Sequence, residues 1–105
     1  MSMDFFDRFR AALGAPETLH DSMIGRDAVI EGPFGPRRMI YADHVASGRA
    51  LLPVEHAILR DVLPWYANSH TEASHCGALM TRLRRAARVR VAQGCGAGPD
   101  HTVIF

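Results

Sequence analysis

Lysine is absent from this chain, because all twelve of its basic residues are arginine. The arginine side chain stays protonated at physiological pH, so it cannot replace a neutralisable amine. A reaction that needs a lysine amine therefore cannot be completed by these 105 residues.

Long apolar runs and a cysteine framework are missing as well. No segment approaches the roughly 20 apolar residues that a membrane-spanning helix needs. The first ten residues carry two aspartates and two arginines, unlike the apolar core of a signal peptide. The two cysteines, Cys76 and Cys95, stand far apart, which predicts reduced thiols. These absences predict a cytoplasmic protein without a membrane partner.

The composition is that of an ordinary globular protein. Hydrophobic residues make up 48% of the chain and charged residues 22%, which predicts a folded domain and not a disordered segment. The length allows one small domain at most. A net charge of +1 provides no overall attraction to nucleic acid or to an anionic membrane surface, so neither is expected as a partner.

The first half of the sequence predicts a helix and a β-hairpin. Phenylalanines recur at helical spacing after Asp4, and Gly14 stands where that helix would stop. A cluster of glycines and prolines then separates two short runs that predict strands, the first of which has an alternating pattern. The predicted order is a helix over 4–13, a loop or short helical turn over 15–25, and strands over 27–31 and 38–42 joined by a turn at 32–36.

The second half predicts two helices around a polar loop. Pro53 suits the first turn of a helix, and Pro64 should end or kink it. Ser74 or Thr71 is expected to cap the longest helix, whose apolar stripe follows steps of four residues. The predicted order is a loop over 43–52, a helix over 53–62, a polar loop over 66–73, a long helix to 93, a break at 94–100 and a strand over 102–105.

The expected last strand, Val103-Ile104-Phe105, is wholly apolar. A buried strand of this type needs neighbours on both edges and both faces. We therefore expect a truncated piece of a larger α/β protein. The alternative is a small domain whose last strand pairs with the hairpin.

The polar loop contains Asn68, Ser69, His70, Thr71 and Glu72 in succession. Such a cluster between two helices suits a small polar ligand, and a histidine there can act as an acid or a base near neutral pH. The alternative is a solvated loop that only caps the following helix. Spacing alone does not separate the two interpretations.

Four segments, taken together, resemble the N-terminal part of class V aminotransferases, the cysteine desulfurase-like enzymes that depend on pyridoxal phosphate. Their order and spacing carry the resemblance, which covers roughly residues 24–105. The segments are 40–49 (Ile-Tyr-Ala-Asp-His-Val-Ala-Ser-Gly-Arg), 62–72 (Val-Leu-Pro-Trp-Tyr-Ala-Asn-Ser-His-Thr-Glu), 81–88 (Thr-Arg-Leu-Arg-Arg-Ala-Ala-Arg) and 98–105 (Gly-Pro-Asp-His-Thr-Val-Ile-Phe).

The resemblance implies an α/β fold, a fragment of a fold type I pyridoxal-phosphate-dependent transferase. Residues 1–65 would form an N-terminal small-domain and interface segment. Residues 66–105 would begin the large cofactor-binding domain, including the first strand of its parallel sheet. The intact relatives are usually homodimers, so the implied partner is the remainder of the enzyme or a second subunit.

The resemblance also implies candidate site residues. Ala46, Ser47 and Gly48 match the small-residue loop on the substrate side, where a ligand can approach the backbone closely. Asn68 and His70 match the active-site polar loop. Asp43, which matches an aspartate closing the first strand, is interpreted as structural. His44 and Val45 depart from the family pattern, and His75 and Cys76 stand where small residues are commoner.

Catalysis by this chain alone is not expected. Pyridoxal phosphate chemistry needs a lysine for a Schiff base, a carboxylate beside the pyridine nitrogen and a turn that holds the phosphate. The lysine is absent, and in the family the phosphate-holding turn follows the position of Phe105. We therefore expect no catalytic, cofactor-binding or metal-ligating residue in these residues. The alternative function is a non-catalytic interaction module that docks on a larger partner.

Three other patterns favour structural interpretations. His70, His75 and Cys76 lie close together but lack the paired short spacings of zinc sites. The glycine-rich run 94–98 follows a helix and lacks the final glycine of a dinucleotide fingerprint, so it predicts a helix end. Five arginines between 82 and 90 suit either a nucleic-acid-binding face or a solvated face, and we expect the solvated face.

Overall fold

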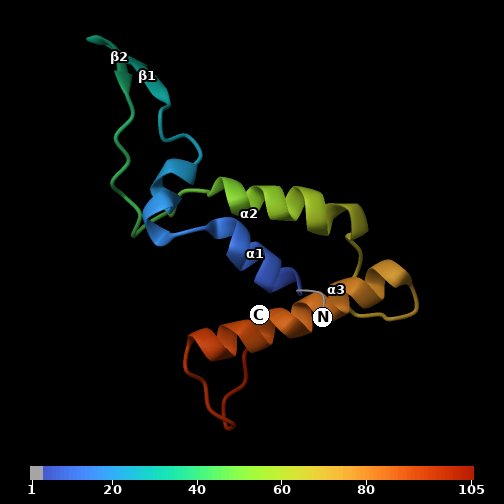
Figure 1. The fold of residues 1–105 in the computed structure, drawn as a ribbon. Coiled ribbons are helices and arrows are strands. Elements are labelled where there is room, and N and C mark those ends of the chain that lie inside the picture. The colour runs from blue at the N-terminus through green and yellow to red at the C-terminus, as the bar shows by residue number, and fades with distance from the viewer. Residues whose placement is uncertain (1–3) are drawn as a thin grey trace.

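The computed structural model describes residues 4–105 and shows a mixed helix and strand protein with one two-stranded antiparallel sheet in this range (Figure 1). A β-hairpin projects from one end, and the longest helix lies at the opposite side. The elements in chain order are α1 (Phe5–Leu13), the 3-10 helix η1 (Pro16–Ser22), β1 (Val29–Gly32), β2 (Gly35–Arg38), α2 (Leu52–Ala57), the π-helical turn η2 (Ile58–Val62), the 3-10 turn η3 (Leu63–Trp65) and α3 (His75–Gly94).

Helix α1 ends at the predicted residue, Leu13, and begins one residue later than predicted, because Asp4 is its N-cap. The Asp4 carboxylate accepts a hydrogen bond from the Asp7 backbone N–H at 2.8 Å, which satisfies one of the free donors of the first turn. Gly14 ends the helix with a φ of 69°, a conformation that costs glycine little. The segment after it forms η1, one of the two structures expected for residues 15–25.

The β-hairpin is confirmed, but its second strand was predicted too late in the chain. Gly32 pairs with Gly35 across a turn of two residues, so β2 occupies 35–38 and the strand expected at 38–42 is wrong. The five-residue turn expected at 32–36 is wrong for the same reason. Gly35 adopts a φ of 87°, which lets this short turn close. Beyond β2, only Met39 continues the pairing, donating to the Ala28 carbonyl at 2.8 Å.

A short bridge closes the base of the hairpin. Met23 pairs with Leu51, and the Ile24 N–H donates to the Ala50 carbonyl at 2.9 Å. The chain leaves this bridge directly into α2, with Pro53 in the first turn as predicted. The hairpin and the loop over 39–50 therefore form one projecting arm, attached beside η1 (Figure 1).

Pro64 changes the end of the second helix, as predicted. The helix continues past Ala57 as a π-helical turn, in which the Leu63 N–H bonds to the Ile58 carbonyl. Pro64 has no N–H to donate to the Arg60 carbonyl, and its ring would clash with that group in a regular α-helix. A wider turn and then a tight one, Leu63–Trp65, relieve this conflict.

Both ends of α3 carry capping motifs. The Ser74 hydroxyl accepts from the Gly77 N–H at 3.0 Å, which confirms Ser74 as the N-cap. At the other end, the Ala97 N–H bonds to the Ala92 carbonyl at 2.9 Å and the Gly96 N–H to the Gln93 carbonyl at 3.2 Å. These two bonds, with Gly96 at a φ of 66°, form a Schellman motif. The glycine run 94–98 thus ends a helix, as expected.

The strand expected over 102–105 is wrong. These residues adopt no strand, and the side chains of Ile104 and Phe105 are exposed. A strand needs a hydrogen-bonding edge, and the hairpin lies at the other end of the molecule (Figure 1). The segment turns back toward α3 instead, where the Phe105 ring lies 5.8 Å from the guanidinium carbons of both Arg84 and Arg88.

The packed core of the described chain is small. Ala57 and Met80 are its buried apolar side chains, and they lie on the two helices that face each other across α1. The radius of gyration is 18.1 Å, whereas a compact domain of this length has about 13 Å. The molecule is therefore elongated. Few side chains pack the arm and α3 against the rest of the chain.

A salt bridge joins the first helix to the last. Arg90 on α3 lies 3.0 Å from the Asp4 carboxylate and 2.9 Å from that of Asp7. The hydrogen bond from the Asp7 backbone N–H, together with that from Arg90, lowers the pKa of the Asp4 carboxyl below its ordinary value. The folded state therefore favours the charged carboxylate.

Acid should weaken this contact. A carboxyl with a lowered folded pKa contributes stability above its unfolded pKa and loses that contribution as pH falls through the folded value. We expect the free energy of unfolding, from urea titrations between pH 6 and about pH 2, to fall more steeply in the wild type than in Asp4→Asn, because asparagine keeps the cap and removes the charge. Asp100→Asn, which removes an exposed carboxylate outside this contact, should follow the wild type. Parallel curves for wild type and Asp4→Asn would contradict the assignment.

Within residues 4–105, no helix combines the length and the apolar character that crossing a bilayer requires.

Candidate functional site

The polar loop between η3 and α3 owes its shape to its own side chains. The Asn68 side-chain oxygen accepts from the His70 backbone N–H at 3.0 Å, and the Thr71 hydroxyl accepts from the Ala73 N–H at 3.2 Å. Both are local turns of the kind that asparagine and threonine favour. The loop therefore has a defined backbone although residues 66–74 form no helix or strand.

Thr81 tethers this loop to α3. Its hydroxyl lies 2.7 Å from the Ser69 carbonyl oxygen, 2.8 Å from that of Gly77 and 3.3 Å from that of Thr71. A hydroxyl has one proton to donate, so it serves one carbonyl at a time. Two of these acceptors belong to the loop, so Thr81 holds the loop backbone against the helix.

Gly77 provides the space for this contact. It is buried, and a Cβ at this position would lie 2.7 Å from the Thr71 carbonyl oxygen and 3.0 Å from the Ser74 hydroxyl. Only glycine allows the loop backbone to approach the first turn of α3 so closely. The Glu72–Arg85 ion pair, at 3.0 Å, adds little because both side chains are mostly exposed.

The two candidate residues of this loop face solvent. Asn68 and His70 are both exposed. The Asn68 side-chain oxygen is engaged in its turn, while its amide nitrogen makes no hydrogen bond within residues 4–105. The imidazole of His70 is likewise without a protein partner in this range. The loop thus offers a neutral donor and a titratable ring from a fixed backbone.

The small-residue loop is also held by its neighbours. The Tyr41 hydroxyl donates to the Ser47 carbonyl at 2.6 Å and lies 3.3 Å from that of Asp43, which also accepts from the Ser47 N–H at 3.0 Å. Asp43 therefore shapes the loop through its backbone carbonyl. Ala46, Ser47 and Gly48 are exposed, and a Cβ on Gly48 would meet no atom within 4 Å.

The structure does not bring the two loops together. Residues 46–48 lie in the arm, and residues 68–70 lie beyond the far end of η3 (Figure 1). The whole of α2, η2 and η3 separates them. Within this chain each loop therefore presents its residues independently, and a joint site would need another chain or segment.

The histidines and cysteines weighed for a metal do not converge in the part of the chain that the structure describes. No group of three potential ligands is close enough to hold an ion there. The His75 ring instead lies edge-on to Trp65, with 5.7 Å between the ring centres. His75 thus helps to join η3 to α3.

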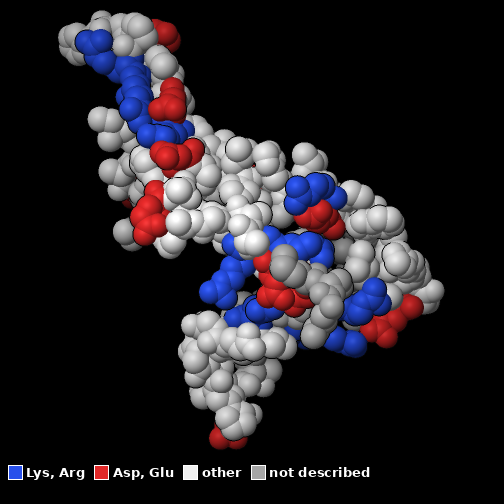
Figure 2. Space-filling model, viewed as in Figure 1, with Lys and Arg blue, Asp and Glu red and all other residues white. Residues whose placement is uncertain are grey.

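The arginines of α3 are largely engaged with acids and an aromatic ring. Arg85 pairs with Glu72, Arg90 with Asp4 and Asp7, and Arg84 and Arg88 flank Phe105. Figure 2 shows basic and acidic residues interleaved in this region of the visible face. This distribution favours structural roles for these side chains over a continuous phosphate-binding face.

The structure also forms cavities that no sequence motif marks, and two of them carry charged side chains of interest. One, of about 450 Å³, lies between α1 and α2 and includes Phe9, His56 and the pair Arg60–Asp61. Arg60 binds Asp61 through two bonds of 3.0 and 2.9 Å, which lowers the pKa of the Asp61 carboxyl. The other lies at the base of the arm. No sequence spacing signals either cavity, because segments far apart in the chain form their walls.

The side chains of this chain do not fit a covalently held pyridoxal phosphate. The cofactor is held as an imine of a lysine amine, and none of the 105 residues is lysine. We therefore derive no catalytic step through the cofactor. Comparison of the chain with known protein families, curated proteins and solved structures finds no match.

Proposed function

We propose that this chain supplies N-terminal elements of a class V aminotransferase-like enzyme of fold type I. Such an enzyme uses pyridoxal phosphate to transaminate an amino acid or to remove sulfur from cysteine. Residues 1–65 provide small-domain and interface elements, and residues 66–105 begin the cofactor domain. The lysine and the phosphate-holding turn come from protein outside these residues, so the chain is not catalytic alone.

One observation carries this proposal. The polar loop with Asn68 and His70 is held by Thr81 and Gly77, while the two candidate side chains themselves remain exposed. A loop that serves only to cap a helix is held by the Ser74 cap and does not need the additional hydrogen bond from Thr81. A site needs a fixed backbone that presents free polar groups.

The surface area supports a missing partner. The chain exposes 8316 Å², whereas a compact monomer of its mass exposes about 5,800 Å². The excess on this one chain, about 2,500 Å², lies at the upper end of the roughly 1,000–2,500 Å² that each partner contributes to a permanent interface. The remainder of the enzyme or a second subunit, as in a homodimer, would cover it.

A second candidate is a non-catalytic interaction module that docks on a larger partner. The exposed apolar side chains of Leu59, Leu63 and Tyr66 favour it, since such groups mark contact surfaces. This candidate requires a folded, soluble chain with a cooperative melting transition. The enzyme-part proposal predicts a chain that, without its partner, is marginally stable or aggregates. Thermal melting combined with size-exclusion chromatography separates the two.

The enzyme proposal is tested by trapping the cofactor. We expect borohydride to reduce no pyridoxal adduct onto a side chain when the chain alone is mixed with pyridoxal phosphate. Because the chain has no lysine, its N-terminal amine is the one aliphatic amine that could form such an imine, and acetylation blocks it. With the protein that co-purifies with the chain, reduction should label a lysine of that protein. An adduct on a side chain of residues 1–105, or none in the assembly, would contradict the proposal.

A further inference from the structure

Three arginines surround a cavity at the base of the arm. The cavity, of about 370 Å³, lies between the hairpin, the end of η1 and the segment 38–49. No acidic residue lines it. Its wall combines cationic and apolar side chains, among them Arg26, Arg38, Arg49, Met23, Met39 and Tyr41.

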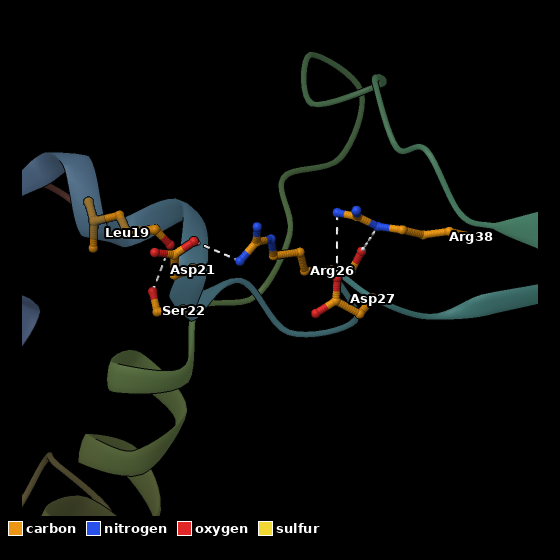
Figure 3. A network of polar contacts seen from close by, with 6 residues as sticks. All are labelled: Leu19, Asp21, Ser22, Arg26, Asp27 and Arg38. Atoms are coloured by element: carbon orange, nitrogen blue, oxygen red, sulfur yellow. Dashed lines mark hydrogen bonds and ion pairs between the residues drawn. The ribbon is translucent and has the colours of Figure 1, made fainter.

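Two of the arginines are oriented by acids that lie outside the cavity. Arg26 pairs with Asp21 at 2.6 Å, and Arg38 lies 3.4 Å from Asp27 (Figure 3). Both carboxylates are mostly exposed. Each ion pair occupies only part of a guanidinium, which carries five N–H donors, so further donors remain for a ligand.

The third arginine lies closely against a glycine. The Arg49 guanidinium lies 4.9 Å from the centre of the Tyr41 ring and donates to the Ile24 carbonyl at 3.3 Å. A Cβ on Gly25 would lie 2.5 Å from the Arg49 Nη2 atom. Gly25 also has a φ of 81°, a conformation that glycine adopts readily. The cation–π contact with Tyr41 helps to hold the guanidinium at the cavity.

One donor in this group is unsatisfied. The Arg26 Nε atom is buried and has no hydrogen-bond partner in the described chain. Leaving a buried donor unpaired costs about 1–3 kcal/mol, and more for a charged group. This unmet donor adds to the positive charge that the three guanidiniums bring to the cavity.

We propose that this cavity binds a small phosphate monoester with an apolar body. A phosphate monoester carries close to two negative charges and three strong acceptor oxygens. It can therefore bind three guanidinium groups at once, which a single carboxylate, with one charge and two oxygens, does less well. Met23, Met39 and Tyr41 form the surface for the apolar part. The site does not depend on the aminotransferase proposal, because none of the candidate site residues of that proposal, Ala46, Ser47, Gly48, Asn68 and His70, lines the cavity.

The test is a titration of the full chain with phenyl phosphate, followed by NMR through the arginine Nε–H signals. We expect a saturable shift of the Arg26 signal, weaker binding of inorganic phosphate and of benzoate, and no effect of phenol. The absence of a saturable shift, or equal binding of benzoate, would overturn the proposal.

Matched variants separate a built site from general attraction. Arg26→Gln should weaken binding at least about tenfold, the loss expected for a charged hydrogen bond. Arg37→Gln removes the same charge from the neighbouring position of β2, which points to the other face, and should weaken it less than about twofold. Arg38→Gln serves as a second variant if Arg26→Gln unfolds. Equal losses of affinity for Arg37→Gln and the two cavity variants would show that general electrostatic attraction holds the ligand, which would overturn the proposal of a built site.

Discussion

Met80→Ala should lower the free energy of unfolding by about 2–5 kcal/mol, the largest effect of any single substitution we expect. Met80 is 7% exposed and is, with Ala57, the buried apolar core of the described chain. It borders the junction where Phe5 of α1 and Trp65 of η3 meet α3. Truncation would remove the largest buried side chain and leave a space that so few neighbours cannot refill. Because the buried core is this small, the loss is a large part of the total stability.

Urea unfolding followed by circular dichroism measures this effect. Val89→Ala is the matched control, because Val89 lies on the same helix and is 55% exposed. It should change the free energy of unfolding by no more than about 0.5 kcal/mol. If Val89→Ala destabilises the chain as much as Met80→Ala, then Val89 is covered in solution, and the small core described here is incomplete.

Gly77→Ala should lower the free energy of unfolding by about 1–3 kcal/mol, although alanine is the better helix former. The new methyl group would lie 2.7 Å from the Thr71 carbonyl oxygen, which belongs to the backbone and cannot rotate away. The loop over 66–74 would have to leave the helix, and the Thr81 hydroxyl would lose its bonds to Ser69 and Thr71. Local loosening of the loop should accompany the global loss.

Gly94→Ala provides the control for Gly77→Ala. Gly94 ends the same helix, and a Cβ there meets no atom within 4 Å. Alanine should therefore be neutral or should stabilise the chain by up to about 1 kcal/mol. Hydrogen exchange of the amides of residues 68–73 should quicken in Gly77→Ala and stay unchanged in Gly94→Ala. If Gly77→Ala and Gly94→Ala changed the free energy of unfolding in the same direction, this would contradict the close approach of the loop to the helix at Gly77.

Short-range chemistry made much of the secondary structure predictable. The cap at Ser74, the stop at Gly14, the helix start at Pro53 and the turn after it at Pro64 each depend on neighbours within a few residues. The same holds for the position of the polar loop with Asn68 and His70.

The predictions that are wrong concern segments whose structure depends on residues outside the segment itself. Strand 38–42 was placed too late because the pairing of Gly32 with Gly35 sets the register, and the sequence permits more than one turn length. The apolar run 103–105 predicts a strand only if an edge is near, and none is. Thr81 and Gly77 were not singled out, because their role appears only when the loop folds back on α3.

By itself, the amino-acid sequence determined that no lysine is present, where the main helices lie, and that a hairpin stands between the first helix and the second. Tertiary structure alone decided that the two candidate loops lie apart and that three arginines from distant segments share one cavity. The physical reason is one of range. Capping and turn preferences act between residues close in sequence, whereas a cavity depends on which segments meet, and the free energy of packing across the whole chain selects that arrangement.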